Sequence, residues 1–384
     1  MTMEVDTPTE VSAAPPNRLL QPGDAAPWFT GTTAFNPTFQ FDTVAGRHVV
    51  IAFPGPLTRP PGVAFLAALA AEGDVFNDED VCLFPVAGDP VDIARGLAAD
   101  RIPGVRWFRD LDGSLAARYR AQRDGDGPGA VVPHMLLLDP ALRVVERFDL
   151  DGDVARTRAA FAGLRRLPPV AGDGWSVPSA PVLVVPRVLE RDLCRRLVDL
   201  YETVGGSESG FMTSRDGKSV GVQDASRKRR SDCMIEDEGL RNLLRQTLYR
   251  RLVPMIQRGL QFRATRIERY VVACYEGERR GFFTAHRDNT TPATRHRKFA
   301  VTINLNAEDY EGGDLRFPEF GRRSYRAPTG GAVVFSCSLM HEALPVTRGR
   351  RYAFLPFLYD DAAAGVRRET QQLIVDYGKP PAPG

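Results

Sequence analysis

In the first half of the chain, short apolar runs alternate with segments that carry apolar residues at helical spacing. Turn residues bound each run, and an Asp139-Pro140 turn separates the last two. Strands are predicted at 47–53, 81–89 and twice within 133–150, and helices at 62–76 and 90–101. Because strands interleaved with helices are typical of a sheet covered by helices, we expect an α/β domain over residues 18–166.

The second half has a different order of elements. Two long segments, 190–204 and 237–260, carry apolar residues at helical spacing. After residue 264 the chain becomes a series of short apolar runs separated by Gly and Pro. Strands are predicted within 265–277, 298–306, 313–318, 331–337 and 350–359. Helices followed by many short strands predict an α+β unit whose strands close into a barrel or sandwich.

A segment rich in Pro and Gly separates the two halves. LPPVAGDGWSVPSAP, at 167–181, predicts a linker that we place at 167–182, so that the second domain spans 183–375. The first 17 residues lack the basic start and apolar run of a signal peptide and are predicted to form a disordered leader. Residues 376–384 are expected to be a flexible tail.

Composition narrows the class of protein. The 384 residues are 43% hydrophobic and 26% charged, with a net charge of +2, which is typical of a globular protein and not of a nucleic-acid-binding one. No stretch approaches the roughly eighteen apolar residues that cross a bilayer, so we expect no membrane association. The five cysteines are scattered without a CxxC pair, which favours reduced thiols and a cytoplasmic protein.

The stretch GFFTAHRDNTT, at 281–291, places His286 and Asp288 two positions apart, so that both point the same way from an extended segment. His341 lies 55 positions later, just past an apolar run. Two imidazoles and one carboxylate leave coordination sites open on a metal, as in non-haem Fe(II) oxygenases. A lone HxD is usually a surface or capping pair, and a lone His341 is usually structural. The ordered set in a strand-rich half is more specific and predicts a metal site.

Three stretches carry a resemblance to a known family over roughly residues 183–362. YVVACYEGERRGFFTAHRDN, AVTINLNAEDYEGGDLRFPEF and LMHEALPVTRGRRYAFLPFLY resemble the prolyl 4-hydroxylase-like branch of the 2-oxoglutarate/Fe(II) dioxygenases. The resemblance implies a double-stranded β-helix, or jelly roll, with His286, Asp288 and His341 as iron ligands. It also implies that Arg351, ten positions after the distal histidine, pairs with the distal carboxylate of 2-oxoglutarate, a role that suits the planar guanidinium.

Further positions near these motifs leave alternatives open. Tyr275 occupies the family's YxxG position, where it either hydrogen-bonds the cosubstrate or substrate or packs as a strand tyrosine. Asn304 falls where some relatives place a tyrosine that helps to bind 2-oxoglutarate. Arg348 and Arg350 are rival carboxylate binders, but Arg350 has the opposite parity to Arg351 along the strand, and Arg348 falls in the turn.

The resemblance implies an oxidative reaction. Fe(II), 2-oxoglutarate and O2 would hydroxylate an unactivated C–H bond, on a prolyl residue or an amino-acid-derived small molecule, with release of succinate and CO2. Ascorbate is a candidate reductant. The basic runs SRKRRSD, at 226–232, and RHRK, at 295–298, are interpreted as solvated loops. The alternative is a positive rim that attracts 2-oxoglutarate or an acidic substrate.

The first half resembles the peroxiredoxins, which have a thioredoxin fold, over about residues 19–165. The resemblance rests on LQPGDAAPWFTG, RHVVIAFPGPLTRPPGVAFLAAL, FPVAGDPVDIARGLA and FRDLDGSLAARYRA. Of the family's PxxxTxxC motif, Pro54 and Thr58 match, but Pro61 stands at the position of the peroxidatic cysteine. Cys82, inside an apolar run, is expected to pack as a small hydrophobe. Pro133 is a candidate for the family's cis-proline, with an ordinary trans proline as the alternative.

These observations imply a 2-oxoglutarate hydroxylase whose first domain keeps a redox scaffold without its nucleophile. That domain is expected to dock a partner or present the substrate. Two alternatives belong to other classes. The first is a non-catalytic binding protein, against which the complete set His286, Asp288, His341 and Arg351 argues. The second is a thiol peroxidase, which Pro61 argues against.

Overall fold

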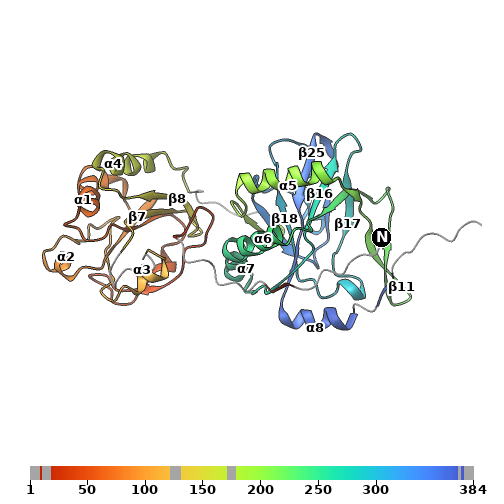
Figure 1. Ribbon diagram of the computed structural model, residues 1–384, viewed down its shortest axis with the longest axis horizontal. Coiled ribbons are helices and arrows are strands. Elements are labelled where there is room, and N and C mark those ends of the chain that lie inside the picture. Colours follow the sequence, from red (N-terminus) through yellow and green to blue (C-terminus); the bar gives the residue numbers. More distant parts are fainter. Residues whose placement is uncertain (1–8, 11–18, 122–130, 171–178, 371–372, 376–384) are drawn as a thin grey trace, which may run out of the picture. The chain divides into compact units, whose positions relative to one another are not determined.

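The chain divides into two compact units, residues 16–175 and residues 176–384, and the first 15 residues are grouped with the latter. In Figure 1 the former is coloured red to yellow-green and the latter green to blue. The computed structural model describes residues 9–10, 19–121, 131–170, 179–370 and 373–375. Half of the predicted linker, residues 171–178, and the whole predicted tail lie outside these residues.

Two residues of the predicted leader form a strand. β1 (Thr9–Glu10) pairs antiparallel with β15 (Arg266–Glu268), with Thr9 opposite Ile267. The prediction of disorder is therefore wrong for these two residues, because a strand edge far along the chain offers them hydrogen-bond partners. The rest of the leader lies outside the described residues.

The first unit contains a five-stranded mixed sheet in the order β6-β5-β4-β7-β8. β4, β5 and β6 are parallel, whereas β7 and β8 are antiparallel to their neighbours. The strands are β4 (His48–Phe53), β5 (Val81–Ala87), β6 (Phe108–Arg109), β7 (His134–Leu138) and β8 (Val144–Asp149). The helices are α1 (Pro60–Glu72), α2 (Pro90–Ala94), α3 (Ser114–Arg118) and α4 (Val154–Gly163). The mixed α/β architecture expected here is confirmed.

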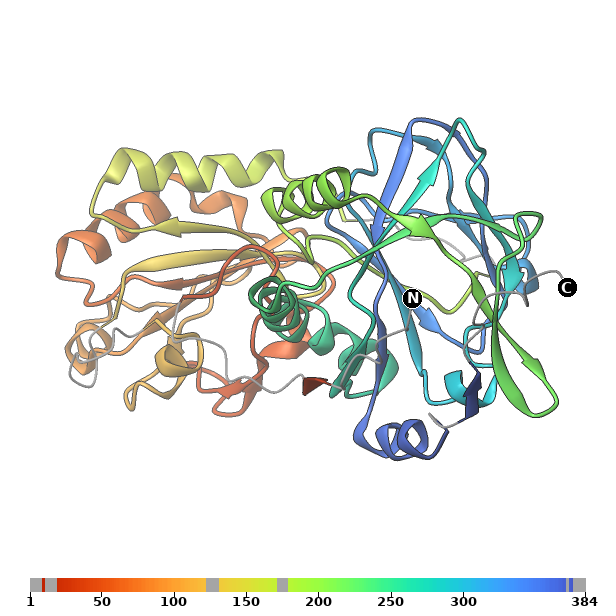
Figure 2. The same cartoon turned by 45° about the vertical axis from the view of Figure 1, so that its right-hand side comes forward.

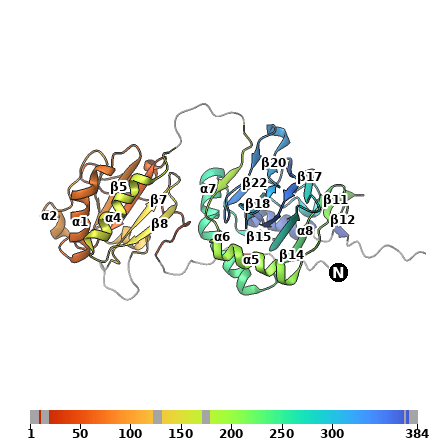
Figure 3. The ribbon, with the colours of Figure 1, turned by 90° about the horizontal axis from the view of Figure 1, so that it is seen from above.

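Side chains of the central strand β4 alternate between two cores, as the pleat requires. Val50 and Ala52 face a core that contains side chains of α1 and α4, and Val49 and Ile51 face a core that contains side chains of α3. Figures 1 and 3 show α1 and α4 on one side of the sheet. Since both faces are covered, every residue of β4 and β5 is buried.

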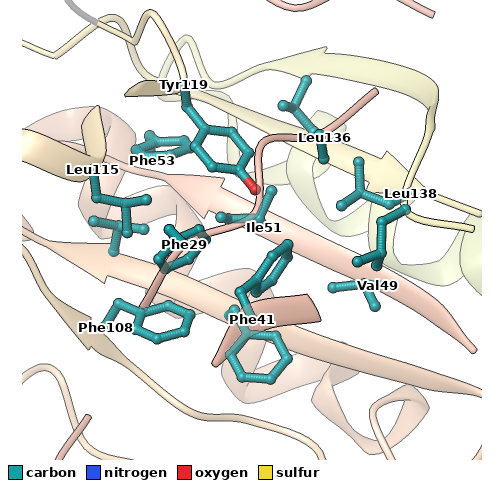
Figure 4. Packing of buried hydrophobic residues seen from close by; sticks show 14 of the residues in the cluster. Phe29, Phe41, Val49, Ile51, Phe53, Phe108, Leu115, Tyr119, Leu136 and Leu138 are labelled. Carbon is teal, nitrogen blue, oxygen red and sulfur yellow. The ribbon is translucent and has the colours of Figure 1, made fainter. Parts of the chain in front are cut away.

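An aromatic cluster fills the second of these cores (Figure 4). The ring of Phe29 stacks on Phe41 at 4.8 Å and meets Phe108 edge-on at 5.0 Å between centroids. Two short strands, β2 (Thr30–Gly31) and β3 (Phe39–Gln40), bring Phe29 and Phe41 over the sheet. The Tyr119 hydroxyl donates a hydrogen bond to the Pro27 carbonyl at 3.0 Å, which satisfies the polar end of a buried ring.

Pro61, which the sequence comparison aligned with the peroxidatic cysteine, lies in the first turn of α1. Pro60 and Pro61 begin this helix, where a backbone N–H has no intrahelical partner and proline is tolerated. The cis peptide bond found among the described residues lies at Ile102-Pro103, so the suggestion of a cis bond at Pro133 is wrong.

Cys82 does not replace the missing nucleophile in this structure. Its side chain is buried in β5, and burial raises the pKa of the thiol to about 12. A thiol that stays protonated at neutral pH is a poor nucleophile. We therefore expect no thiol-dependent consumption of hydrogen peroxide by the metal-free full-length protein, measured with a thiol reductant in excess. Turnover that Cys82→Ser removes would contradict this expectation.

The second unit contains two antiparallel sheets. The larger follows the order β1-β15-β26-β18-β25-β16-β14-β10, with β22 paired to β18 and β9 to β22. Its other strands are β9 (Leu183–Val185), β10 (Ser207–Glu208), β14 (Ser231–Met234), β16 (Val271–Glu276), β18 (Phe299–Asn304), β22 (Ala332–Ser336), β25 (Arg350–Phe354) and β26 (Phe357–Tyr359). The smaller, β13-β17-β23-β20-β21, consists of β13 (Lys228–Arg229), β17 (Phe282–His286), β23 (His341–Ala343), β20 (Leu315–Arg316) and β21 (Ser324–Tyr325).

The two sheets pack face to face around shared apolar cores. One core joins Ala273 and Tyr275 of the larger sheet to Phe283 and Ala343 of the smaller. Figure 2 shows the strands of both sheets from the side. Two shorter pairings border them: β11 (Phe211–Arg215) with β12 (Lys218–Val222) and β27 (Ile374–Val375), and β19 (Glu311–Gly312) with β24 (Val346–Arg348). The expected α+β architecture with a β-sandwich is confirmed.

Helices cover one side of the larger sheet, away from β17. They are α5 (Arg191–Val204), α6 (Glu238–Arg251) and α7 (Val253–Leu260), and α8 (Asp361–Thr370) follows the last long strand (Figures 1 and 3). Leu193, Leu197 and Tyr201 form the buried stripe of α5. The described helices include none that is long and apolar enough to span a membrane.

Candidate metal centre

Two neighbouring strands of the smaller sheet bring the histidines together. His286 ends β17 and His341 begins β23, and the two residues are paired across the antiparallel ladder. A bulge between Phe283 and His286 shifts the register at this point. Asp288 follows in a loop, where its backbone N–H donates to the Cys337 carbonyl at 3.0 Å. The three side chains predicted from the sequence thus meet where β17 ends and β23 begins.

Their donor atoms converge on a common point. Nε2 of His286 lies 3.5 Å from Oδ1 of Asp288, and Nε2 of His341 lies 3.3 Å from Oδ2. One ligand atom from each residue can be chosen so that all three lie within 4.8 Å of one another. These separations are those of donors around a single ion whose bonds are near 2 Å.

Backbone carbonyls fix the tautomer of both histidines. Nδ1 of His286 lies 2.8 Å from the Thr284 carbonyl, and Nδ1 of His341 lies 3.0 Å from the Leu339 carbonyl. Because a carbonyl only accepts hydrogen bonds, each Nδ1 carries the proton and donates it. The lone pair is then on Nε2, which points to the centre, as in metal-binding histidines.

The surroundings favour a neutral imidazole and an ionised carboxylate. Burial lowers the pKa of His286, which keeps its lone pair free. Burial by itself would raise the pKa of Asp288, but His341 and His286 together hold it well below its usual range. The rings of Phe283 and His286 stack with their centroids 3.6 Å apart, and the centroids of Phe335 and His341 lie 4.5 Å apart. This donor set fits a divalent ion with open coordination positions, such as Fe(II).

Arg351 lies on β25 of the larger sheet, next to the core that Tyr275 shares with Phe283 and Ala343 of the metal-ligand strands. It pairs with Tyr275 on β16, and its guanidinium lies 5.0 Å from the centroid of that ring. The side chain is buried, and its Nε and Nη1 have no hydrogen-bond partner among the residues that the structure describes. A buried guanidinium with unused donors is costly unless an anion completes it. A ligand carboxylate could accept hydrogen bonds from these unused nitrogens, so the site fits one.

Tyr310, which the sequence analysis missed, adds a hydroxyl to this position. Its Oη is buried without a hydrogen-bond partner in the described part of the chain. The Arg326 guanidinium lies 4.3 Å from the centroid of the Tyr310 ring, and Arg351 and Tyr310 both border Gly313. Burial raises the pKa of Tyr310, and Arg351 followed by Arg326 opposes the rise. Gly313 leaves the space open: its φ is +69°, and a Cβ there would lie 2.7 Å from Val346 and 3.2 Å from Arg351.

The rival arginines lie outside the interior. Arg348 is exposed and forms an ion pair with Glu311 at 2.6 Å, and Arg350 is exposed and lies 3.3 Å from Glu202. Asn304 is buried and donates to the Ala327 carbonyl at 2.7 Å. Tyr310, six positions after Asn304, supplies the hydroxyl that Asn304 lacks, and its place before the EGG turn was the signal in the sequence.

The basic run at 226–232 is partly buried. Lys228 and Arg230 are 7% and 9% exposed, so the interpretation as a solvated loop is wrong for them. Burial, with Arg230 adding to it, lowers the pKa of the Lys228 amine well below its usual range. In the second run, Arg297 donates to Glu268 at 2.6 Å, and the Nε2 of His296 lies 2.6 Å from the same carboxylate. Partners from distant segments make this burial possible.

Residues 270–359 match the family model of the 2OG-Fe(II) oxygenase superfamily. The second unit contains a 2OG-Fe(II) oxygenase domain. A PKHD-type hydroxylase of Synechococcus sp. is 31% identical over 112 residues, which cover 27% of this chain and 49% of that protein. The PKHD-type hydroxylase PiuC of Pseudomonas aeruginosa is 33% identical over 110 residues, covering 27% and 46%. The chain spans about half the length of the curated relatives it matches.

Solved structures show weaker similarity. A prolyl-4-hydroxylase of Pseudomonas putida is 19% identical, covers 47% of this chain and 93% of its own, and has a TM-score of 0.33. Peroxidoxin BcpB from Mycobacterium tuberculosis is 19% identical, covers 39% of this chain and 99% of its own, and has a TM-score of 0.31.

Proposed function

We propose that the protein is an Fe(II)- and 2-oxoglutarate-dependent dioxygenase that hydroxylates an unactivated C–H bond and releases succinate and CO2. The observation that carries the proposal is the convergence of His286, Asp288 and His341 in the same β-sandwich as the buried, unsatisfied guanidinium of Arg351. The metal donors and the anion site are the two features that an iron-bound 2-oxoglutarate would require. The match of residues 270–359 to the oxygenase superfamily supports it.

Each residue of the site has a separate task in this proposal. His286, Asp288 and His341 hold the iron, which together with 2-oxoglutarate supplies the power to oxidise a C–H bond with O2. Arg351 binds the distal carboxylate through its fork, with the Tyr310 hydroxyl beside it and Tyr275 under the guanidinium. Phe283 and Phe335 lie against the histidine rings and exclude water. A double-stranded β-helix is the fold that we assign to the two sheets.

The substrate and the first unit complete the proposal. A prolyl residue or an amino-acid-derived molecule is the first candidate substrate, and ascorbate is the proposed reductant. The first unit is proposed to be a thioredoxin-like scaffold of the peroxiredoxin kind. With Pro61 in place of the nucleophile, it would dock a partner or present the substrate in the cytoplasm.

Succinate formation tests the proposed function. The full-length protein, supplied with Fe(II), 2-oxoglutarate and O2, should form succinate, and a substrate in a panel of amino acids and peptides should gain the mass of one oxygen atom. A protein that binds neither Fe(II) nor 2-oxoglutarate would be the non-catalytic alternative.

The Tyr310 hydroxyl offers a test of the anion site. Tyr310→Phe removes one hydrogen-bonding group and keeps the ring, so we expect the Kd for 2-oxoglutarate to rise by about 5- to 20-fold, or about 1–2 kcal/mol. Titration calorimetry with Mn(II) in place of iron would measure it. Tyr249→Phe, on helix α6, is the matched control and should leave the Kd unchanged. An unchanged Kd in Tyr310→Phe would remove this residue from the site.

A further inference from the structure

Lys228 lies one aromatic ring away from a proposed iron ligand. Its Nζ donates to the Ser209 hydroxyl at 2.7 Å and to the Gly210 carbonyl at 2.6 Å. The ammonium lies 4.8 Å from the centroid of Phe283, and the same ring stacks on His286 at 3.6 Å. Neither of the two acceptors carries a charge. The Lys228 amine thus reaches the interior of the site with no carboxylate hydrogen-bonded to it among the described residues, and an anion beside it would favour its protonated form.

Arg230 lies between Lys228 and the proposed cosubstrate site. It shares the Ser209 hydroxyl with Lys228 and the Tyr275 ring with Arg351. Its Nη2 donates to Asp232 at 2.6 Å, and its Nη1 lies 3.4 Å from the Tyr275 hydroxyl. The buried Nε has no hydrogen-bond partner among the described residues. Arg269 donates to the same oxygen of Asp232 at 3.1 Å. One carboxylate therefore serves two guanidinium groups, with Lys228 near enough to affect its pKa.

The charges of this interior do not balance. Four guanidinium groups are linked through Tyr275, Asp232, Phe357 and Glu268, namely those of Arg230, Arg269, Arg297 and Arg351. The Lys228 amine shares the Ser209 hydroxyl with Arg230. Three carboxylates contact these guanidinium groups or the metal-ligand histidines among the described residues: Asp232, Glu268 and Asp288. The four guanidinium groups exceed the three carboxylates by one positive charge, and a protonated Lys228 would add a second. Fe(II) would add two and 2-oxoglutarate would remove two, so the excess persists when both are bound. Buried charge of one sign is costly without a partner.

We propose that Lys228 and Arg230 form an anion subsite for a carboxylate of the molecule that is hydroxylated. This inference rests on the proposed function and names its substrate class. Since both cations are buried, the carboxylate must enter the interior, which favours a small carboxylic acid, such as a free or N-acylated amino acid, over the middle of a protein chain. Arg351 is occupied by the cosubstrate in this arrangement, which leaves Lys228 and Arg230 to the substrate.

Acetate and acetamide are a matched pair of probes, because they have nearly the same shape and differ in charge. The full-length protein is first saturated with Mn(II) and with N-oxalylglycine, an unreactive 2-oxoglutarate analogue that fills the Arg351 site. Paramagnetic relaxation of the probe's methyl protons by Mn(II) then reports binding near the metal. We expect the Kd for acetate to be at least about tenfold lower than for acetamide. Failure of Mn(II) or N-oxalylglycine to bind would overturn the proposed function instead.

Charge-removing variants show which residues hold the probe. Lys228→Met and Arg230→Gln should each raise the Kd for acetate by about tenfold or more, while N-oxalylglycine still binds. Arg229→Met is the matched control, because Arg229 lies between them in sequence and is exposed. Equal relaxation of acetate in wild type, Lys228→Met and Arg230→Gln would mean that acetate binds the metal directly, and it would overturn the subsite. Equal affinity for acetate and acetamide in the wild type would also overturn it, without any variant.

Discussion

His286→Ala is expected to abolish both Fe(II) binding and 2-oxoglutarate turnover. The proposed site has three protein ligands, and removing one leaves a histidine and a carboxylate, which hold a divalent ion weakly. The backbone carbonyl of Thr284, which orients the ring at 2.8 Å, cannot replace the lost nitrogen. We expect the Kd for Fe(II) to rise by at least about 100-fold and succinate formation to fall to background.

Anaerobic titration with Fe(II) and a succinate assay would measure the two effects. His341→Ala should behave in the same way, because His341 approaches the other oxygen of the same Asp288 carboxylate. His48→Gln is the control: this histidine lies in the first unit, on β4, and its loss should leave iron binding unchanged. Full iron-dependent turnover in both alanine variants would show that the three residues do not form the metal site.

Arg351→Ala is expected to weaken 2-oxoglutarate binding while leaving Fe(II) binding nearly intact. The guanidinium is buried and is not one of the proposed metal ligands, and two of its nitrogens have no hydrogen-bond partner in the described structure. Losing a charge-assisted pair in a desolvated pocket costs about 2–5 kcal/mol, or about 30-fold to several-thousand-fold in affinity. Arg351→Lys should recover part of this loss, because the charge returns without the fork.

Calorimetry with 2-oxoglutarate, alongside a separate titration with metal, would separate the two effects. Arg350→Ala is a matched control, because it removes the neighbouring guanidinium, which is exposed and lies 3.3 Å from Glu202. Its affinity for 2-oxoglutarate should equal that of wild type. If Arg351→Ala binds 2-oxoglutarate as tightly as wild type does, Arg351 is not the anchor.

Local pattern was sufficient for the elements and for the ligand candidates. β4 and β5 are apolar throughout, and strands of this kind are buried on both faces, as the structure confirms. The spacing of His286 and Asp288 predicted side chains on one side, and the two do converge. The assumed extended segment ends at His286, however, and Asp288 reaches the same point from a turn that a hydrogen bond to the Cys337 carbonyl holds. Pro61 has no thiol, and no tertiary contact can supply one.

Tertiary structure alone decided which charged residues enter the interior. In the sequence, Lys228 and Arg230 belong to a polar run, and burial of a charge is favourable only when partners compensate its desolvation. Those partners are Ser209, Asp232 and Tyr275. Ser209 lies 19 positions from Lys228, and Tyr275 lies 45 positions from Arg230. The positions of Tyr310 and Arg351 around Gly313 and the pairing of His286 with His341 likewise depend on strand register. Register is set by the packing of whole sheets, which no short stretch of sequence contains.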